Sequence, residues 1–127
     1  MTLLDDRNEL NGPPDTRWTA ACRYDYLIPC RGVGVLLPDG AQAALFRLDD
    51  GSLHAIGNID PFSGAAVMSR GITGDRGGRA IVQSPIKKQA FAFDDGSCLD
   101  DPSVSLPVYR TRRTADGVVE IEAPVEG

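Results

Sequence analysis

The sequence predicts an all-β fold, a small antiparallel barrel or sandwich built from stacked hairpins. Asp-Gly pairs recur between short apolar runs, at residues 39–40, 50–51, 95–96 and 116–117. This dipeptide is a strong hairpin signal because Asp and Gly both tolerate positive φ. The segment Val118–Ala123 alternates apolar and acidic residues, which indicates a strand with one solvated face.

Eight segments have the length and composition of β-strands. They are Trp18–Leu27, Gly32–Leu37, Ala43–Leu48, Leu53–Gly57, Arg79–Ser84, Ala90–Asp94, Leu106–Arg113 and Val118–Ala123. The segment Ala65–Arg70 favours a short helix or a turn. The glycine-rich segment Gly71–Ala80 is predicted to be a tight turn between strands, with an exposed arginine-bearing loop around Arg76 that meets an acidic partner as the alternative.

Length and composition predict one soluble domain. The chain has 127 residues, of which 42% are hydrophobic and 24% charged, enough for a single core. Residues 1–15 are polar and contain Pro13-Pro14, so we expect a flexible tail followed by a β domain over residues 16–127. No apolar run suits a signal peptide or approaches the roughly 20 residues of a membrane span. We therefore expect a cytoplasmic location.

The charge balance argues against two classes of partner. The 18 acidic residues outnumber the 13 basic ones, giving a formal net charge of −5. A nucleic-acid surface needs cations to neutralise phosphates, and binding to an anionic membrane surface has the same requirement. The sequence therefore predicts neither nucleic acid nor a membrane as a partner.

The cysteines are expected to be free thiols. Cys22, Cys30 and Cys98 are odd in number and irregularly spaced, and a reducing compartment would not keep disulfides. A bridge between Cys22 and Cys30 is the alternative, if the strands bring the two residues together.

Candidate catalytic groups are few. The single histidine, His54, lies in a strand-like stretch, and a Ser-His-Asp site would have to use it. No Gly-x-Ser-x-Gly motif is present, and zinc normally takes several His or Cys ligands. We interpret His54 as structural, with an autonomous hydrolase as the alternative. The paired aspartates at residues 49–50, 94–95 and 100–101 are interpreted as turn residues that bond the local backbone rather than metal ligands.

Three further residues are candidates for contact or packing. Lys87 and Lys88 are interpreted as solvated residues that discourage edge-to-edge strand pairing. Phe62, in a Pro-Phe-Ser-Gly loop, either caps the core or anchors a partner. On its residues alone, the chain is an acidic all-β module without a catalytic apparatus of its own, and binding or scaffolding is the natural class.

Two proline-containing stretches resemble the cluster-binding loops of Rieske iron–sulfur domains. They are NIDPFSGA, residues 58–65, and QSPIKKQAFAFDDGSCLDDP, residues 83–102. In that family, two loops hold a [2Fe–2S] cluster between two Cys and two His. The resemblance implies a Rieske-like fold with both loops at one tip, and no cluster, because the four ligand positions are occupied by Asp60, Phe62, Ser84 and Lys87.

Among Rieske-like domains, the chain is similar to the small subunits of the bacterial assimilatory NAD(P)H-dependent nitrite reductases. The similarity is carried by GNIDPFSGAAVMSRGITGDRGG, residues 57–78, and SPIKKQAFAFDDGSCLDDPSVSLPVYRTRR, residues 84–113, and covers about residues 16–123. It implies a subunit of an enzyme that reduces nitrite to ammonium, with no catalytic, cofactor-binding or metal-binding residue in this chain. It also implies a large partner subunit that carries FAD, an iron–sulfur cluster and sirohaem.

The predicted contacts with that large subunit are Asp60, Phe62, Lys87, Lys88 and Arg76. In the competing interpretation the two loops merely close one end of the barrel, and docking uses another face, such as the loop near Arg76. Two other functions stay open. One is a stand-alone Rieske-fold module that binds a ligand or a protein, since fold does not fix function. The other is a ferredoxin-like electron carrier, which the missing ligands argue against.

Overall fold

The structure, a computed structural model, describes residues 16–124. The predicted tail of residues 1–15 lies outside the described residues, so the domain boundary at residue 16 stays a prediction. Within the described range the chain is all-β, as predicted, with two single-turn 3₁₀ segments, η1 (Tyr24–Tyr26) and η2 (Met68–Arg70). No helix in this range is long and apolar enough to cross a membrane.

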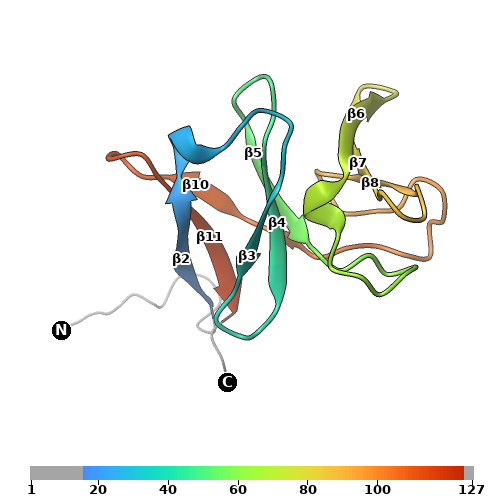
Figure 1. The fold of residues 1–127 in the computed structure, drawn as a ribbon, viewed down its shortest axis with the longest axis horizontal. Coiled ribbons are helices and arrows are strands. Elements are labelled where there is room, and N and C mark those ends of the chain that lie inside the picture. The colour runs from blue at the N-terminus through green and yellow to red at the C-terminus, as the bar shows by residue number, and fades with distance from the viewer. Residues whose placement is uncertain (1–15, 125–127) are drawn as a thin grey trace.

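The strands form three antiparallel sheets (Figure 1). The first has the order β10-β11-β2, the second β3-β4-β5-β9 and the third β6-β7-β8. The sheet β3-β4-β5-β9 lies between the other two in the view of Figure 1. The strand bounds are β2 Thr16–Arg23, β3 Val33–Leu36, β4 Gln42–Arg47, β5 Leu53–Gly57, β6 Ile72–Arg76, β7 Arg79–Gln83, β8 Ala90–Ala92, β9 Val108–Tyr109, β10 Thr111–Arg113 and β11 Val118–Pro124.

Strand β4 is buried on both faces and separates two hydrophobic cores. Successive side chains of a strand point to opposite faces. Ala43 and Leu45 accordingly pack in one core with residues of β2 and β11, while Ala44 and Phe46 pack in the other with residues of β7 and β8. All four side chains are fully buried. The second core supports the loops that follow β5 and β7.

The four Asp-Gly pairs form turns, as predicted. Their glycines have φ between 76° and 90°, the left-handed region that glycine enters without strain. The requirement is strictest at Gly96, where an added Cβ would lie 2.1 Å from the carbonyl oxygen of Leu106. The turn chemistry therefore fixes where the strands begin and end.

Three boundaries differ from the sequence-based expectation. The segment Gly71–Ala80 is not one tight turn, because β6 runs along β7 and only Gly77-Gly78 makes the turn. Strand β6 is a sheet edge with mostly exposed residues, so it has no hydrophobic alternation to detect. The first predicted strand ends early, at η1, and Leu106–Arg113 divides into β9 and β10, which belong to different sheets.

Candidate functional site

The first proline loop, which follows β5, is held in shape by its own backbone. The amide of Asp60 donates to the carbonyl of Ala65 at 2.8 Å, and the amide of Gly64 donates to the carbonyl of Asp60 at 2.7 Å. The side-chain oxygen Oδ1 of Asp60 accepts the amide proton of Phe62 at 2.9 Å. This is the local Asx-turn bonding that Asp favours, and it directs the carboxylate inward.

The second proline loop, which follows β7, is closed in a similar way. The amide of Ser84 donates to the carbonyl of Gln89 at 3.0 Å, and the amide of Lys88 donates to the carbonyl of Ser84 at 3.1 Å. Lys88 has a φ of 68°, a left-handed conformation that is uncommon outside glycine. The side chain of Gln83 supports this strained residue by donating to the Lys88 carbonyl at 2.8 Å.

One hydrogen bond joins the two loops, which together are called the tip below (residues 58–67 and 84–89). The hydroxyl Oγ of Ser84 donates to Oδ2 of Asp60 at 2.6 Å, and the two residues are 1% and 0% exposed. A bond of this length to a carboxylate is charge-assisted and stronger than a neutral one. Burial opposes ionisation of Asp60, but the hydrogen bonds from Ser84, Phe62 and Ser63 outweigh burial and hold its pKa below the ordinary value.

The other two ligand-equivalent residues have different surroundings. Phe62 is half-buried, and its ring centroid lies 6.3 Å from that of Phe91, so part of the ring packs on the second core and part faces solvent. Lys87 is exposed, as is its neighbour Lys88. Asp60, by contrast, is fully buried. Its carboxylate is therefore out of reach of a partner, which corrects the expectation that Asp60 is a contact residue.

The tip does not fit a [2Fe–2S] cluster. Rieske clusters need two thiolates and two imidazoles, whereas the four positions offer a carboxylate, a phenyl ring, a hydroxyl and an ammonium group. The carboxylate and the hydroxyl are already bonded to each other. Within residues 16–124, no three or more His, Cys, Asp or Glu side chains are grouped so that they could hold a metal ion. The described cysteines Cys22, Cys30 and Cys98 are free thiols.

The arginines of the β6–β7 hairpin are neutralised by neighbouring carboxylates. Arg76 pairs with Asp100 at 3.2 Å, and Arg79 pairs with Asp94 at 2.7 Å and with Asp95 at 3.1 Å. The hairpin is thus exposed, as the alternative interpretation of this segment required, but its positive charges face acidic groups of the same chain. This balance makes the region near Arg76 a weaker candidate for meeting an acidic partner.

The paired aspartates act in turns, as predicted. One aspartate of each pair accepts the amide and hydroxyl protons of the serine two residues later, and hydrogen bonds from that serine are the main cause of its lowered pKa. These pairs are Asp50 with Ser52, Asp95 with Ser97 and Asp101 with Ser103.

His54 lacks the geometry of a catalytic base. Its ring lies half-buried on β5, with its centroid 5.1 Å from that of Phe93. The hydroxyl of Ser52 donates to Asp50 at 2.6 Å, and Ser52 Oγ lies 3.0 Å from Nε2 of His54. Because the hydroxyl proton goes to Asp50, Nε2 must be the donor to Ser52, the reverse of a catalytic triad. Burial lowers the pKa of His54 despite the nearby carboxylates, which leaves the ring neutral at pH 7.

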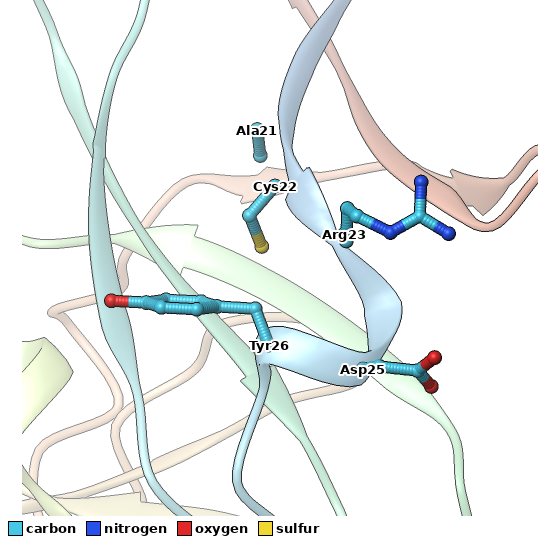
Figure 2. A pocket seen from close by; sticks show the side chains of 5 residues that line it. All are labelled: Ala21, Cys22, Arg23, Asp25 and Tyr26. Atoms are coloured by element: carbon cyan, nitrogen blue, oxygen red, sulfur yellow. The ribbon is translucent and has the colours of Figure 1, made fainter.

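A hollow that sequence analysis did not identify lies at the end of β2. It has a volume of about 580 Å³ and is lined by residues 21–23, 25 and 26. In Figure 2, the thiol of Cys22 and the ring of Tyr26 extend to one side of the backbone, while Arg23 and Asp25 extend to the other. Burial raises the pKa of the Cys22 thiol, so the thiol stays protonated and is a poor nucleophile. The lining lacks the convergent polar groups expected of a binding site.

A comparison with protein families defines the class of domain to which this chain belongs. Residues 17–122 match the family of Rieske-like [2Fe-2S] domains. The sheets and the paired loops therefore define a Rieske-like domain, as the resemblance implied.

More similar relatives define the particular family. The chain is 40% identical over 107 residues to the small subunit of nitrite reductase (NADH) of Escherichia coli K12, covering 84% of this chain and 97% of the relative. A crystal structure assigned to the NADH-dependent nitrite reductase small subunit of Mycobacterium tuberculosis shares 73% identity with a TM-score of 0.83, covering 85% of this chain and 96% of that chain. The chain belongs to the family of nitrite reductase small subunits.

A third relative bears on partnership. The large subunit of nitrite reductase [NAD(P)H] of Klebsiella oxytoca contains a segment that is 41% identical to this chain over 87 residues. The match covers 68% of this chain and 9% of the large subunit. In that protein, a domain like this one is part of the large-subunit polypeptide.

Proposed function

We propose that this chain is the small subunit of an NAD(P)H-dependent nitrite reductase, which reduces nitrite to ammonium, and that it supports the large subunit without carrying electrons itself. The proposal has two parts: membership of the enzyme, and a non-redox role within it. The first part is supported by the family to which the chain belongs. The second part depends on the chemistry of the tip.

The observation that carries the non-redox role is the hydrogen bond between Ser84 and Asp60. It spans the two loops at ligand-equivalent positions, with both partners buried and 2.6 Å between their oxygens. A fixed bond between loops can replace the cross-linking role of a cluster, but it offers no group that changes oxidation state. The tip then keeps its shape and loses its redox function.

Partnership with a large subunit is supported by the Klebsiella oxytoca protein. A domain within the same polypeptide has a high effective concentration next to the rest of that chain. Separate chains with the same role need a binding surface to reach the same arrangement. We propose that the large subunit holds FAD, an iron–sulfur cluster and sirohaem, and that this chain holds no cofactor, metal or catalytic residue. The free thiols are consistent with a reducing cytoplasm.

Contact with the large subunit is proposed at the tip. After the burial of Asp60 is taken into account, the candidates there are Phe62, Lys87 and Lys88. The exposed part of the Phe62 ring can enter a pocket of the partner, and the two lysines offer charge at its rim. Arg76 stays the candidate for the competing face, with its charge balanced by Asp100.

The test is an affinity pull-down of the full chain from its native cells grown on nitrite, with mass spectrometry and an absorption spectrum of the eluate. We expect a large partner that brings flavin and sirohaem bands. A colourless chain that elutes alone would instead favour a stand-alone Rieske-fold module. Iron–sulfur absorption in the isolated chain would favour the electron-carrier alternative.

A further inference from the structure

Three neighbouring segments of this acidic protein carry more exposed positive than negative charge. Arg31, Arg70, Lys87 and Lys88 are all exposed, and together they are called the basic end. They lie in residues 28–34, 58–74 and 83–89, where the one acidic residue is the fully buried Asp60. The exposed Asp75 follows the second of these segments directly. The formal net charge of the whole chain is −5, so this end runs against the overall balance.

The three segments that carry these cations touch one another in a fixed order. A Cβ added at Gly32 would lie 2.5 Å from the carbonyl oxygen of Ser69, so the first segment packs tightly on the second. A Cβ added at Gly71 would lie 2.7 Å from the carbonyl oxygen of Gln83, and Ile72 pairs with Gln83 in the β6–β7 ladder. The second segment therefore packs on the start of the second tip loop. Close backbone contact therefore brings the three segments together.

A small pocket lies between the first two segments. It has a volume of about 300 Å³ and is lined by residues 30–32 and 69–71. Two of its lining residues, Arg31 and Arg70, are cations, and none of them is acidic. A second hollow, which shares Cys30 with this pocket, has the opposite character and is lined in part by three aspartates. The pocket between the first two segments is therefore the one suited to a carboxylate group.

The cations of the basic end differ from four of the other arginines of the chain. Arg76, Arg79, Arg110 and Arg112 each pair with a carboxylate of the same chain. Within residues 16–124, no such ion pair involves the four cations of the basic end. Their charge is available to a partner.

Apolar side chains accompany this charge. Ile59, Ile72 and Ile86 belong to the same segments and are 42%, 66% and 48% exposed. Protein interfaces commonly combine an apolar centre with a charged rim, and complementary charge speeds encounter and fixes orientation. An acidic partner with apolar residues of its own therefore suits this end of the molecule.

We propose that the basic end docks on an acidic surface of the large subunit, and that the pocket between Arg31 and Arg70 receives a carboxylate side chain from that surface. The inference rests on the proposed function, because it takes the large subunit as the partner. It adds Arg31 and Arg70, which lie outside the tip, to the contact surface. It also assigns the chemistry of the opposing surface.

The test measures the affinity of the full chain for the purified large subunit by titration calorimetry at low and high salt. The main variant is Arg31→Glu with Arg70→Glu, and Lys87→Glu with Lys88→Glu tests the second loop. The matched control is Arg17→Glu with Arg23→Glu, which makes the same charge change at exposed positions of β2. A milder variant, Arg31→Gln with Arg70→Gln, keeps the test valid if charge reversal impairs folding.

We expect each double reversal at the basic end to weaken binding by about tenfold or more at low salt, because like charges then oppose across the interface. We expect the wild-type affinity to fall as salt rises, and the control to stay within about threefold of wild type. If the folded Arg31 and Arg70 variants bound the large subunit as tightly as the wild type, this inference would be overturned and the proposed function would stand. A wild-type chain that does not bind the large subunit at all would overturn both.

Discussion

Removing the hydroxyl of Ser84 should destabilise the domain more than removing any exposed serine hydroxyl. Ser84→Ala deletes the 2.6 Å hydrogen bond to the buried carboxylate of Asp60. A hydrogen bond to a charged group contributes about 1.5–3 kcal/mol, and the carboxylate left behind is poorly solvated. The 3.3 Å contact from the Ile86 amide is also lost but adds less. We therefore expect the free energy of unfolding to fall by about 2–3 kcal/mol.

The effect should depend on pH in a defined direction. The pKa of Asp60 lies below its ordinary value, so its contribution is complete above the ordinary Asp pKa of about 4 and is lost as the pH falls through the lower folded value. In Ser84→Ala, burial of the carboxylate is less well opposed, and its folded pKa rises. The stability difference between wild type and variant should therefore be larger at neutral pH than near pH 4.

The assay is urea unfolding of wild type and variants at both pH values, with Ser105→Ala as the exposed control. Adding Asp60→Asn and the double variant completes a thermodynamic cycle, in which we expect Asp60 and Ser84 to be coupled by about 1–2 kcal/mol. If Ser84→Ala changed stability no more than Ser105→Ala, or if the coupling were zero, the link between the loops would not hold the tip together.

Three further predictions concern other parts of the fold. Gly96→Ala should lower the free energy of unfolding in urea by more than about 3 kcal/mol, because the new Cβ would meet the Leu106 carbonyl. The control Gly40→Ala has a similar φ in open space and should lower it by about 1 kcal/mol; equal losses would contradict this prediction. Burial holds the pKa of His54 below its ordinary value, so the free energy of unfolding of the wild type should decline as the pH falls from about 7 towards 5. His54→Gln should flatten this dependence on pH; an unchanged dependence would show that another group titrates. Phe62→Ala should lower stability by about 1–3 kcal/mol because the ring packs partly on Phe91, while Phe62→Leu should leave unfolding nearly unchanged and report on affinity for the large subunit alone.

The fold was predictable wherever local chemistry decides the structure. The Asp-Gly turns depend on residues two apart in the chain, and their glycines adopt the positive φ that the dipeptide indicates. The edge strand β6 was missed because its exposed residues carry no alternating pattern. The division of Leu106–Arg113 between two sheets is a tertiary effect, since each half pairs with a different strand.

The candidate site was predictable in position but not in chemistry. The resemblance located the two loops and their four ligand-equivalent residues. It did not reveal that Asp60 and Ser84, 24 residues apart, bond to each other and are buried. Nor could the basic end be found along the chain, because Arg31 and Arg70 come to line one pocket only through the packing of Gly32 against Ser69.

We propose that this chain works in nitrite reductase without a cluster at its tip. The most direct test isolates the complex, separates the two subunits without reducing agents or chelators, and measures the iron content of this chain. We predict that the chain travels with the large subunit and, once separated, contains no stoichiometric iron. Stoichiometric iron that remains with this chain after separation would contradict this proposal and favour a role of the tip in electron transfer.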